Sequence, residues 1–334
     1  MRKRCRERLI PAAATAFVMA VAVAAPCQAA EPRWKPEQNV EIVIPTSPGA
    51  GSDVTGRVVQ KMLTDRKLVA VPASVVNKPG GNATLAIAYL NQHPASGHYL
   101  MVANPALLTS FIIGASKMKY TEVTPLGQIG RESVVFVVRA DSPLKSARDL
   151  ADRLKADSGG ITVAFANALG NQNHIAVAQV VKSVGANVRN LKFVVYNGSG
   201  EGLAALLGGH VDLVTISASP VLAHVAAGRL RILAVTAEQR LGGELAAVPT
   251  WRELGVTALS SNWRALVGPR GMTDDQVRYW DEVIAKMTQL PEWKLDLDAK
   301  LVENTYLNAR DTRKLMDAEH AELTAILTEL GLAK

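Results

Sequence analysis

Cysteine is scarce in this sequence: the chain has two, Cys5 and Cys27, and both stand near its beginning. Residues 1–30 have a basic start, then an apolar run, then a small-residue end, a pattern typical of a secretory signal peptide. We predict cleavage after Ala29 or Ala30. The mature chain then has no cysteine, which excludes disulfides and thiol chemistry. No other apolar run is long enough to span a bilayer.

Charge of one sign and aromatic residues are also limited. The formal charge is +7, and the predicted signal peptide carries +4 of it (five Lys or Arg minus Glu7), which leaves +3. Such a mildly basic surface gives no argument for nucleic-acid binding. Aromatic residues make up 5% of the chain, which favours an aliphatic ligand over one stacked on rings. An exported globular chain without cysteine predicts a bacterial periplasmic location.

The motifs of common enzyme classes are missing. The six histidines include no His-x-x-x-His or His-x-His pair, so we predict no metal site. His320 lies on an apolar helix face and is interpreted as structural. Ser142 and Lys145 have the Ser-x-x-Lys spacing, but the other motifs of that class are absent, and Ser199 is not in a Gly-x-Ser-x-Gly elbow. We therefore predict a protein that is not an enzyme and needs no cofactor.

One stretch near the start of the mature chain organises the rest. Val40–Ile44 is short, apolar and β-branched, which predicts a buried strand. A loop over 46–53 follows, with Ser52 or Asp53 as the expected cap of a helix. Backbone N–H groups and the helix dipole suit an anion there. The loop is neither a dinucleotide fingerprint, because Val54 replaces the third glycine, nor a Walker loop, because it has no lysine.

The same alternation of strand, polar loop and helix continues. Further strands are predicted over 74–76, 99–103, 133–139, 161–165, 192–196, 211–216 and 232–236. Helices are predicted between them, for example over 83–90, and Gly159-Gly160 is expected to end the helix that Ser146 caps. Beyond Arg240 the pattern turns helical, and Thr273 is expected to cap a helix. The alternation predicts an α/β fold with parallel sheets covered by helices on both faces.

Polar, glycine-bearing loops follow the strands in both halves of the chain. In open α/β sheets ligands bind outside the carboxyl ends of the strands, so two facing lobes would line one cleft with these loops. The loops are otherwise simple turns. The candidate ligand-binding residues are Thr46, Ser47, Gly49, Ala50, Gly51, Ser52, Asp53, Asn77, Gly80, Gly81, Asn104, Gly170, Asn171, Gln172, Asn173, His174, Gly198, Ser199, Ser217 and Trp263.

Three of these candidates, and Arg264 beside Trp263, have two interpretations each. Asp53 is a helix cap or a ligand contact. His174 donates to a carboxylate or packs inside the fold. Trp263 and Arg264 close over the cleft, with Arg264 paired to a carboxylate, or they are a core tryptophan beside a surface arginine.

Several motifs together resemble a known family. They are Pro45-Thr-Ser-Pro-Gly-Ala-Gly-Ser-Asp53, Val75-Val-Asn-Lys-Pro-Gly-Gly81, Leu206-Leu-Gly-Gly-His-Val-Asp212, Ala227-Gly-Arg-Leu-Arg-Ile-Leu-Ala-Val-Thr236, Val248-Pro-Thr250 and Asn262-Trp-Arg264. The sequence resembles the periplasmic solute-binding proteins of tripartite tricarboxylate transporters, the Bug family. The likeness covers essentially the whole mature chain, and Asn262-Trp-Arg264 is similar to the tricarboxylate-binding branch.

The resemblance implies a two-lobed Venus flytrap, the periplasmic-binding-protein fold, with the ligand carboxylates held by loops 46–53 and 170–174. It also implies delivery to a separate membrane permease of two subunits, driven by an ion gradient. Two loops depart from the family pattern. Ala50 stands at the middle glycine of the first loop, and Asn171, Gln172 and Asn173 replace the usual Ser or Thr of the second.

Our prediction is a monomeric periplasmic binding protein for a small di- or tricarboxylate, an aromatic acid or acidic amino acid being the other acids that fit. We expect one lobe over 31–131 plus 240–334, the other over 132–239, and the hinge near residues 131 and 240. The alternative functions are a carboxylate-sensing protein for a signalling partner, a binding protein of an ABC transporter, and a secreted hydrolase.

Overall fold

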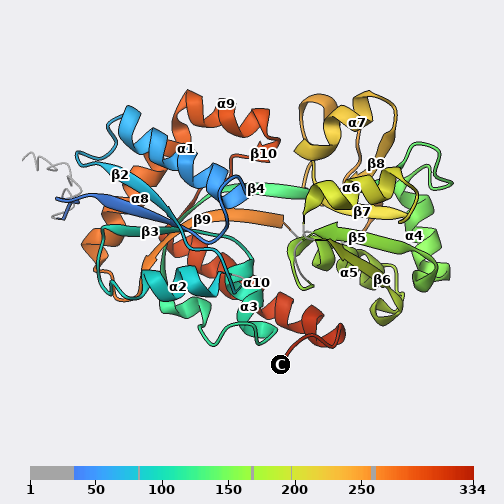
Figure 1. The fold of residues 1–334 in the computed structure, drawn as a ribbon, viewed down its shortest axis with the longest axis horizontal. Coiled ribbons are helices and arrows are strands. Elements are labelled where there is room, and N and C mark those ends of the chain that lie inside the picture. The colour runs from blue at the N-terminus through green and yellow to red at the C-terminus, as the bar shows by residue number, and fades with distance from the viewer. Residues whose placement is uncertain (1–33, 82, 167–168, 197, 257–260) are drawn as a thin grey trace, which may run out of the picture.

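The computed structural model describes residues 34–81, 83–166, 169–196, 198–256 and 261–334. The predicted signal peptide lies outside these residues. Figure 1 shows two lobes of strands and helices on either side of a central crossing, where β4 (Val123–Arg139) passes from one lobe to the other. Within the described residues no helix is long and apolar enough to cross a membrane.

The first lobe is built around β1 (Val40–Ile44), which pairs in parallel with β2 (Ala73–Asn77) and β3 (Tyr99–Ala103). The helices α1 (Gly51–Asp65), α2 (Thr84–Leu90) and α3 (Ala106–Ile112) follow these strands. The sheet continues through β9 (Ser261–Pro269) to β4, and both of these pairings are antiparallel. The predicted parallel arrangement is therefore right for β1–β3 and wrong for the centre of the sheet.

The second lobe repeats the parallel arrangement. Its sheet places β5 (Thr162–Ala166) between β6 (Lys192–Tyr196) and β7 (Leu213–Ser217), with all three parallel. The second half of β4 pairs antiparallel with β7 and with β8 (Leu230–Val235). The covering helices are α4 (Ala147–Ala156), α5 (Gln172–Ser183), α6 (Ser199–Leu207) and α7 (Leu222–Ala226). Helix α4 ends before Gly159-Gly160, which belong to a short 3-10 helix over Ser158–Gly160.

The sheets of the two lobes meet within β4. Ser133 still pairs with Ser261 of β9, whereas the next residue, Val134, pairs with Ser217 of β7. The sequence predicted only the second half of β4 and did not predict β9. Pro125 and two glycines interrupt the apolar pattern of the first half, and the register shifts there. Both strands are recognisable only once they are paired with each other.

The C-terminal part consists of α8 (Asp274–Gln289), α9 (Pro291–Ala299), the short strands β10 (Val302–Glu303) and β11 (Leu307–Asn308), and α10 (Ala309–Glu329). The predicted cap is confirmed, because the Thr273 hydroxyl accepts a hydrogen bond from the N–H of Gln276. Helix α10 contacts both lobes: it packs against α3, and at α5 Gln179 donates to Glu322 over 2.6 Å. Figure 1 shows the end of α10 reaching toward α5.

Candidate functional site

Helix α1 begins at Gly51, earlier than the sequence predicted. Ala50 is its N-cap residue and supplies no side-chain acceptor, and Ser52 and Asp53 lie in the first helical turn. The predicted capping role of Ser52 or Asp53 is therefore wrong. The first N–H groups of a helix have no partner within the helix. The uncapped start of α1 consequently presents N–H donors and the positive end of the helix dipole to an anion.

Asp53 orders the loop in front of α1. Its carboxylate, 2% exposed, accepts hydrogen bonds from Arg57 Nε at 2.9 Å, from the N–H of Gly49 at 2.8 Å and from Asn77 Nδ2 at 2.9 Å. These donors, Arg57 first, lower the pKa of Asp53 to about 2. Asn77 Nδ2 also lies 2.9 Å from the carbonyl oxygen of Thr46, so the carboxylate and the amide together hold loop 46–53 against β2.

The ends of β1 and β3 are joined by polar side chains. Asn104 donates from Nδ2 to Ser52 Oγ at 3.2 Å and accepts from the N–H of Ala106 at 2.9 Å. Thr46 Oγ1 is buried without a hydrogen-bond partner among the described residues, which leaves it able to bind a ligand or water. Ser47 is exposed, and its carbonyl accepts from the N–H of Ala50. The structure thus brings together the candidates from the ends of these two strands.

The glycines of the first lobe shape the same region. Gly49, Gly80 and Gly81 have positive φ angles of 83°, 125° and 56°, which favour glycine. The side chain of Leu85 lies over Gly80 and is 55% exposed. These loops are therefore tight turns that leave an apolar side chain on the surface beside them.

In the second lobe the predicted loop leads into α5. Asn171 caps the helix by accepting from the N–H groups of Asn173 and His174, and its Nδ2 donates to the carbonyl of Ala166 at 2.6 Å. Asn173 is 6% exposed, and its Oδ1 has no partner among the described residues. Gln172 is the first residue of α5. The side chain of Asn171 therefore makes its hydrogen bonds within the loop and the helix start, whereas Oδ1 of Asn173 has no partner among the described residues.

His174 is a packing histidine. It is 2% exposed and stacks on Phe165, with the edge of Phe193 at 4.3 Å between ring centroids. Its Nδ1 accepts from the N–H of Gly170 at 2.9 Å, which places its proton on Nε2. Burial lowers the pKa of His174 to about 4, so the ring is neutral at pH 7. The ring packs inside the fold, and its Nε2 has no hydrogen-bond partner among the described residues, so donation to a ligand carboxylate stays a prediction.

The remaining candidates of the second lobe lie where a helix begins or a strand ends. Gly198 is the N-cap of α6, with no side-chain hydrogen bond, and Ser199 is the first residue of that helix. Ser217 ends β7 at the junction of the two sheets, opposite Val134. Gly198 and Ser199 are thus at a second uncapped helix start, and Ser217 is close to the crossing strands.

Trp263 agrees with its interpretation as a core tryptophan, whereas Arg264 is not the surface arginine expected beside it. Trp263 is fully buried in the core and donates from Nε1 to the Glu319 carboxylate, so its interpretation as a ligand contact over the cleft is wrong. Arg264 is no surface residue: it is 8% exposed, and its Nη2 lies 3.2 Å from a carboxylate oxygen of Glu132. Its Nη1 donates to Asn262.

Sequence reasoning did not single out Glu132, and Asn262 entered only as part of a family motif. No local pattern marked either residue, because Glu132 stands between Arg131 and Ser133 and Asn262 directly follows Ser261. Their register, Glu132 opposite Asn262, makes them a pair.

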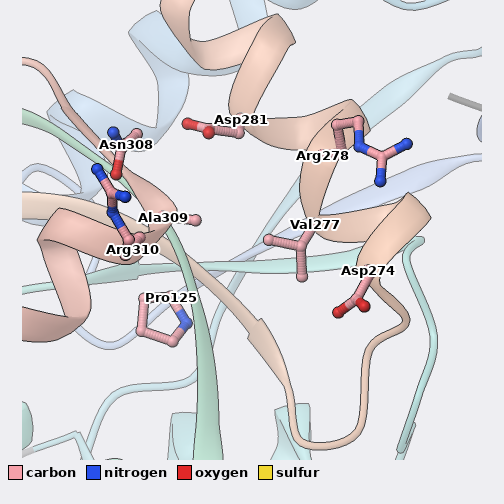
Figure 2. Close-up of a pocket in the computed structure, with 8 residues that line it drawn as sticks. All are labelled: Pro125, Asp274, Val277, Arg278, Asp281, Asn308, Ala309 and Arg310. Atoms are coloured by element: carbon pink, nitrogen blue, oxygen red, sulfur yellow. The ribbon is translucent and has the colours of Figure 1, made fainter. Parts of the chain in front are cut away.

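A surface hollow of about 520 Å³ lies elsewhere, between α8, β4 and the start of α10 (Figure 2). Its lining includes Asp274, Arg278, Asp281 and Arg310, and none of the candidate residues. Among the described residues no three His, Cys, Asp or Glu side chains are grouped so that they could hold a metal ion. The chemistry of the candidate loops is therefore that of hydrogen-bond donors and acceptors.

Two α/β lobes joined by crossing strands, with helix starts at the carboxyl ends of the sheet strands, define the periplasmic-binding-protein fold. The chain belongs to the tripartite tricarboxylate transporter receptor family, because that family's model matches residues 55–332. Proteins of this family are periplasmic solute-binding proteins, which are not enzymes.

Individual relatives agree with this membership. The chain is 27% identical over 328 residues to a Cupriavidus necator protein encoded in the gbd 5′ region, covering 97% of this chain and 96% of that protein. It is 28% identical over 268 residues to protein BugT of Bordetella pertussis, covering 78% of each.

Solved structures show the same fold. A solute-binding protein of the family from Polaromonas has a TM-score of 0.75 at 26% identity and covers 88% of this chain and 99% of that one. An R. palustris protein solved with adipate has a TM-score of 0.74 at 23% identity, covering 89% and 99%. A malate-bound Rhodopseudomonas palustris protein has a TM-score of 0.68 at 19% identity, covering 87% and 99%.

Proposed function

We propose that this protein captures a small organic di- or tricarboxylate between its two lobes and delivers it to a membrane permease of two subunits. The observation that carries the proposal is the uncapped start of α1, beside the polar side chains that join the ends of β1, β2 and β3. A carboxylate there would accept from helix N–H groups and the Ser52 hydroxyl.

Two further observations support an acid as the ligand. Thr46 Oγ1 and Asn173 Oδ1, one in each lobe, are buried polar atoms without partners among the described residues. Such atoms are costly unless a ligand or water satisfies them. The structural relatives solved with adipate and malate hold dicarboxylates, and we extend this ligand class to the present chain.

We propose that ligand capture closes the lobes about the crossing strands. We place one crossing in β4 between Ser133 and Val134, where the strand changes its pairing from β9 to β7, close to the hinge expected near residue 131. The segment after residue 240 still packs with the second lobe, because Leu241 and Leu245 share a buried cluster with Val135 of β4. The second crossing in this proposal is therefore nearer to the start of β9 than to residue 240.

Binding is tested with the mature protein by thermal shift and calorimetry against malate, adipate and citrate, with glucose as a neutral solute. An acid at a hundred times its dissociation constant stabilises the fold by about 2.7 kcal/mol, which raises the melting temperature by a few degrees. Ser52→Ala and Gly51→Val should reduce this rise, and Thr328→Ala, on the exposed face of α10, is the matched control. A shift with glucose and none with any acid would contradict the proposal.

Delivery is tested separately. Uptake of the binding acid by cells that contain the cognate permease should require this protein and be lost with Gly51→Val. Uptake that is unchanged when the protein is deleted would contradict delivery while leaving the binding result intact.

A further inference from the structure

Three polar side chains gather where the sheets of the two lobes meet. Glu132 on β4 and Asn262 on β9 are opposite each other in the register, and Arg264 lies two residues further along β9. One Glu132 oxygen accepts from Asn262 Nδ2 at 2.9 Å and from Arg264 Nη2 at 3.2 Å. The guanidinium side chain is 9% exposed and that of Glu132 is 21% exposed. The cluster is thus a largely buried ion pair on the strands that connect the lobes.

The guanidinium also lies against the start of α1. A Cβ atom on Gly51 would be 3.1 Å from Arg264 Nη2, closer than most side-chain contacts, so glycine at this position permits the approach. The start of a helix carries partial positive charge, and a cation beside it is unfavourable. Two carboxylates offset part of this charge: Glu132 accepts from Arg264, and Asp53 in the first turn of α1 accepts from Arg57, Gly49 and Asn77. Both are already engaged by these donors. An additional anionic oxygen is what this arrangement favours.

We infer that Arg264 is a specificity-determining residue, which makes the site select ligands with an ionised carboxylate at the α1 end, while Glu132 and Asn262 position its guanidinium. This inference rests on the proposed function and deepens it. Arg264 adds a full charge to the neutral donors of loop 46–53, so the substrate class is the fully ionised di- or tricarboxylate. Because Glu132 competes for the same guanidinium, it limits the affinity for that anion.

The test is calorimetry of the mature protein with malate and adipate at pH 7.5, using wild type, Arg264→Met, Arg264→Lys and Glu132→Gln. Arg264→Met should weaken binding of the acid about 10- to 100-fold, the usual range for losing a hydrogen bond to a charged group. Arg264→Lys keeps the charge without the planar fork, so its loss should be smaller. Glu132→Gln should strengthen binding several-fold, since it removes the competing negative charge. Arg278→Met, on the exposed face of α8, is the control and should leave binding unchanged.

The opposite effects of the two charge changes separate specificity from structural support. A purely structural pair would lose affinity with either change. Arg264→Met that keeps its melting temperature and binds the acid as tightly as wild type would overturn the inference, as would Glu132→Gln that weakens binding. If Arg264→Met does not fold, Arg264→Lys and Glu132→Gln decide in the same way. If the wild type binds none of malate, adipate and citrate, the proposed function fails first and this inference fails with it.

Discussion

The carboxyl group of Glu319 should make the stability of this protein depend on pH. It lies half-buried on α10, where it accepts a hydrogen bond from the Trp263 indole. Burial raises the pKa of Glu319 to about 7 from 4.5, while Trp263 and the charge of Arg131 act in the opposite direction and Glu322 adds to the rise. The group therefore holds its proton in the folded state at pH values where the unfolded chain has lost it.

The sign and size of the change in the free energy of unfolding with pH follow from this difference in pKa. Below pH 4.5 the group is protonated in both states, and its neutral form fits the folded protein. Between pH 4.5 and about 7 the unfolded chain releases the proton first, so the free energy of unfolding falls as pH rises. One pKa unit corresponds to about 1.4 kcal/mol, so the total loss is about 3 kcal/mol. Above pH 7 no further change comes from this group.

Glu319→Gln imitates the protonated form and should keep this stability at all pH values. We expect the variant to match wild type near pH 4.5 and to exceed it by about 3 kcal/mol at pH 8, a rise in melting temperature of roughly 5 °C. Urea unfolding at pH 5, 6, 7 and 8 measures the difference. Glu329→Gln on the same helix, whose carboxylate pairs with Lys182 at the surface, is the matched control and should change little.

His174 changes the free energy of unfolding with pH in the opposite direction over part of this range. Its pKa is lowered to about 4, so its contribution to stability is present above pH 6.5 and is lost as pH falls toward 4. Both proteins contain His174, so the difference between wild type and Glu319→Gln cancels its effect. A difference that stays constant from pH 5 to pH 8, or a variant that is less stable at pH 8, would refute the reasoning.

Three further changes test the packing. Gly56→Ala should cost about 1–3 kcal/mol in urea unfolding, because its Cβ would lie 2.1 Å from an isoleucine methyl of β1, whereas Gly200→Ala, with open space at its Cβ, should be neutral. Asp53→Asn should cost roughly 1–2 kcal/mol at pH 7 and nothing near pH 2, because the lowered pKa contributes stability above pH 3.8 that is lost as pH falls toward 2; an equal cost at both pH values would refute this. Trp280→Phe should cost about 2–4 kcal/mol, because it leaves a cavity and a Gly97 carbonyl without its 2.8 Å donor; a cost below 1 kcal/mol would contradict the burial argument.

Much of the α/β pattern was predictable because it is local. Val40–Ile44, Tyr99–Ala103 and Lys192–Tyr196 are short apolar strands whose limits agree with the structure. The caps of α4 and α8 by Ser146 and Thr273 were also predictable, since a cap bonds to N–H groups only a few residues away. The family likewise followed from motifs that are contiguous in the chain.

Long-range pairing was not predictable in the same way. Strand β9 and the first half of β4 have weak local signals, and their partners are more than a hundred residues away. The helix start at Gly51 was also not predicted, because Asp53 accepts from the N–H of Gly49 in the preceding loop and does not cap the helix.

The sequence by itself determined the alternation of strands and helices, the polar loops at the strand ends and the family, because each depends on neighbouring residues. Only the tertiary structure decided what the polar and aromatic residues at the crossing do. Trp263 lies in the core, where its indole donates a hydrogen bond to Glu319 on α10. Arg264 is a buried cation beside Gly51 because β9 pairs with β4 and brings the guanidinium to the start of α1. Burial and charge pairing depend on distant segments meeting in space, and no local pattern contains that information.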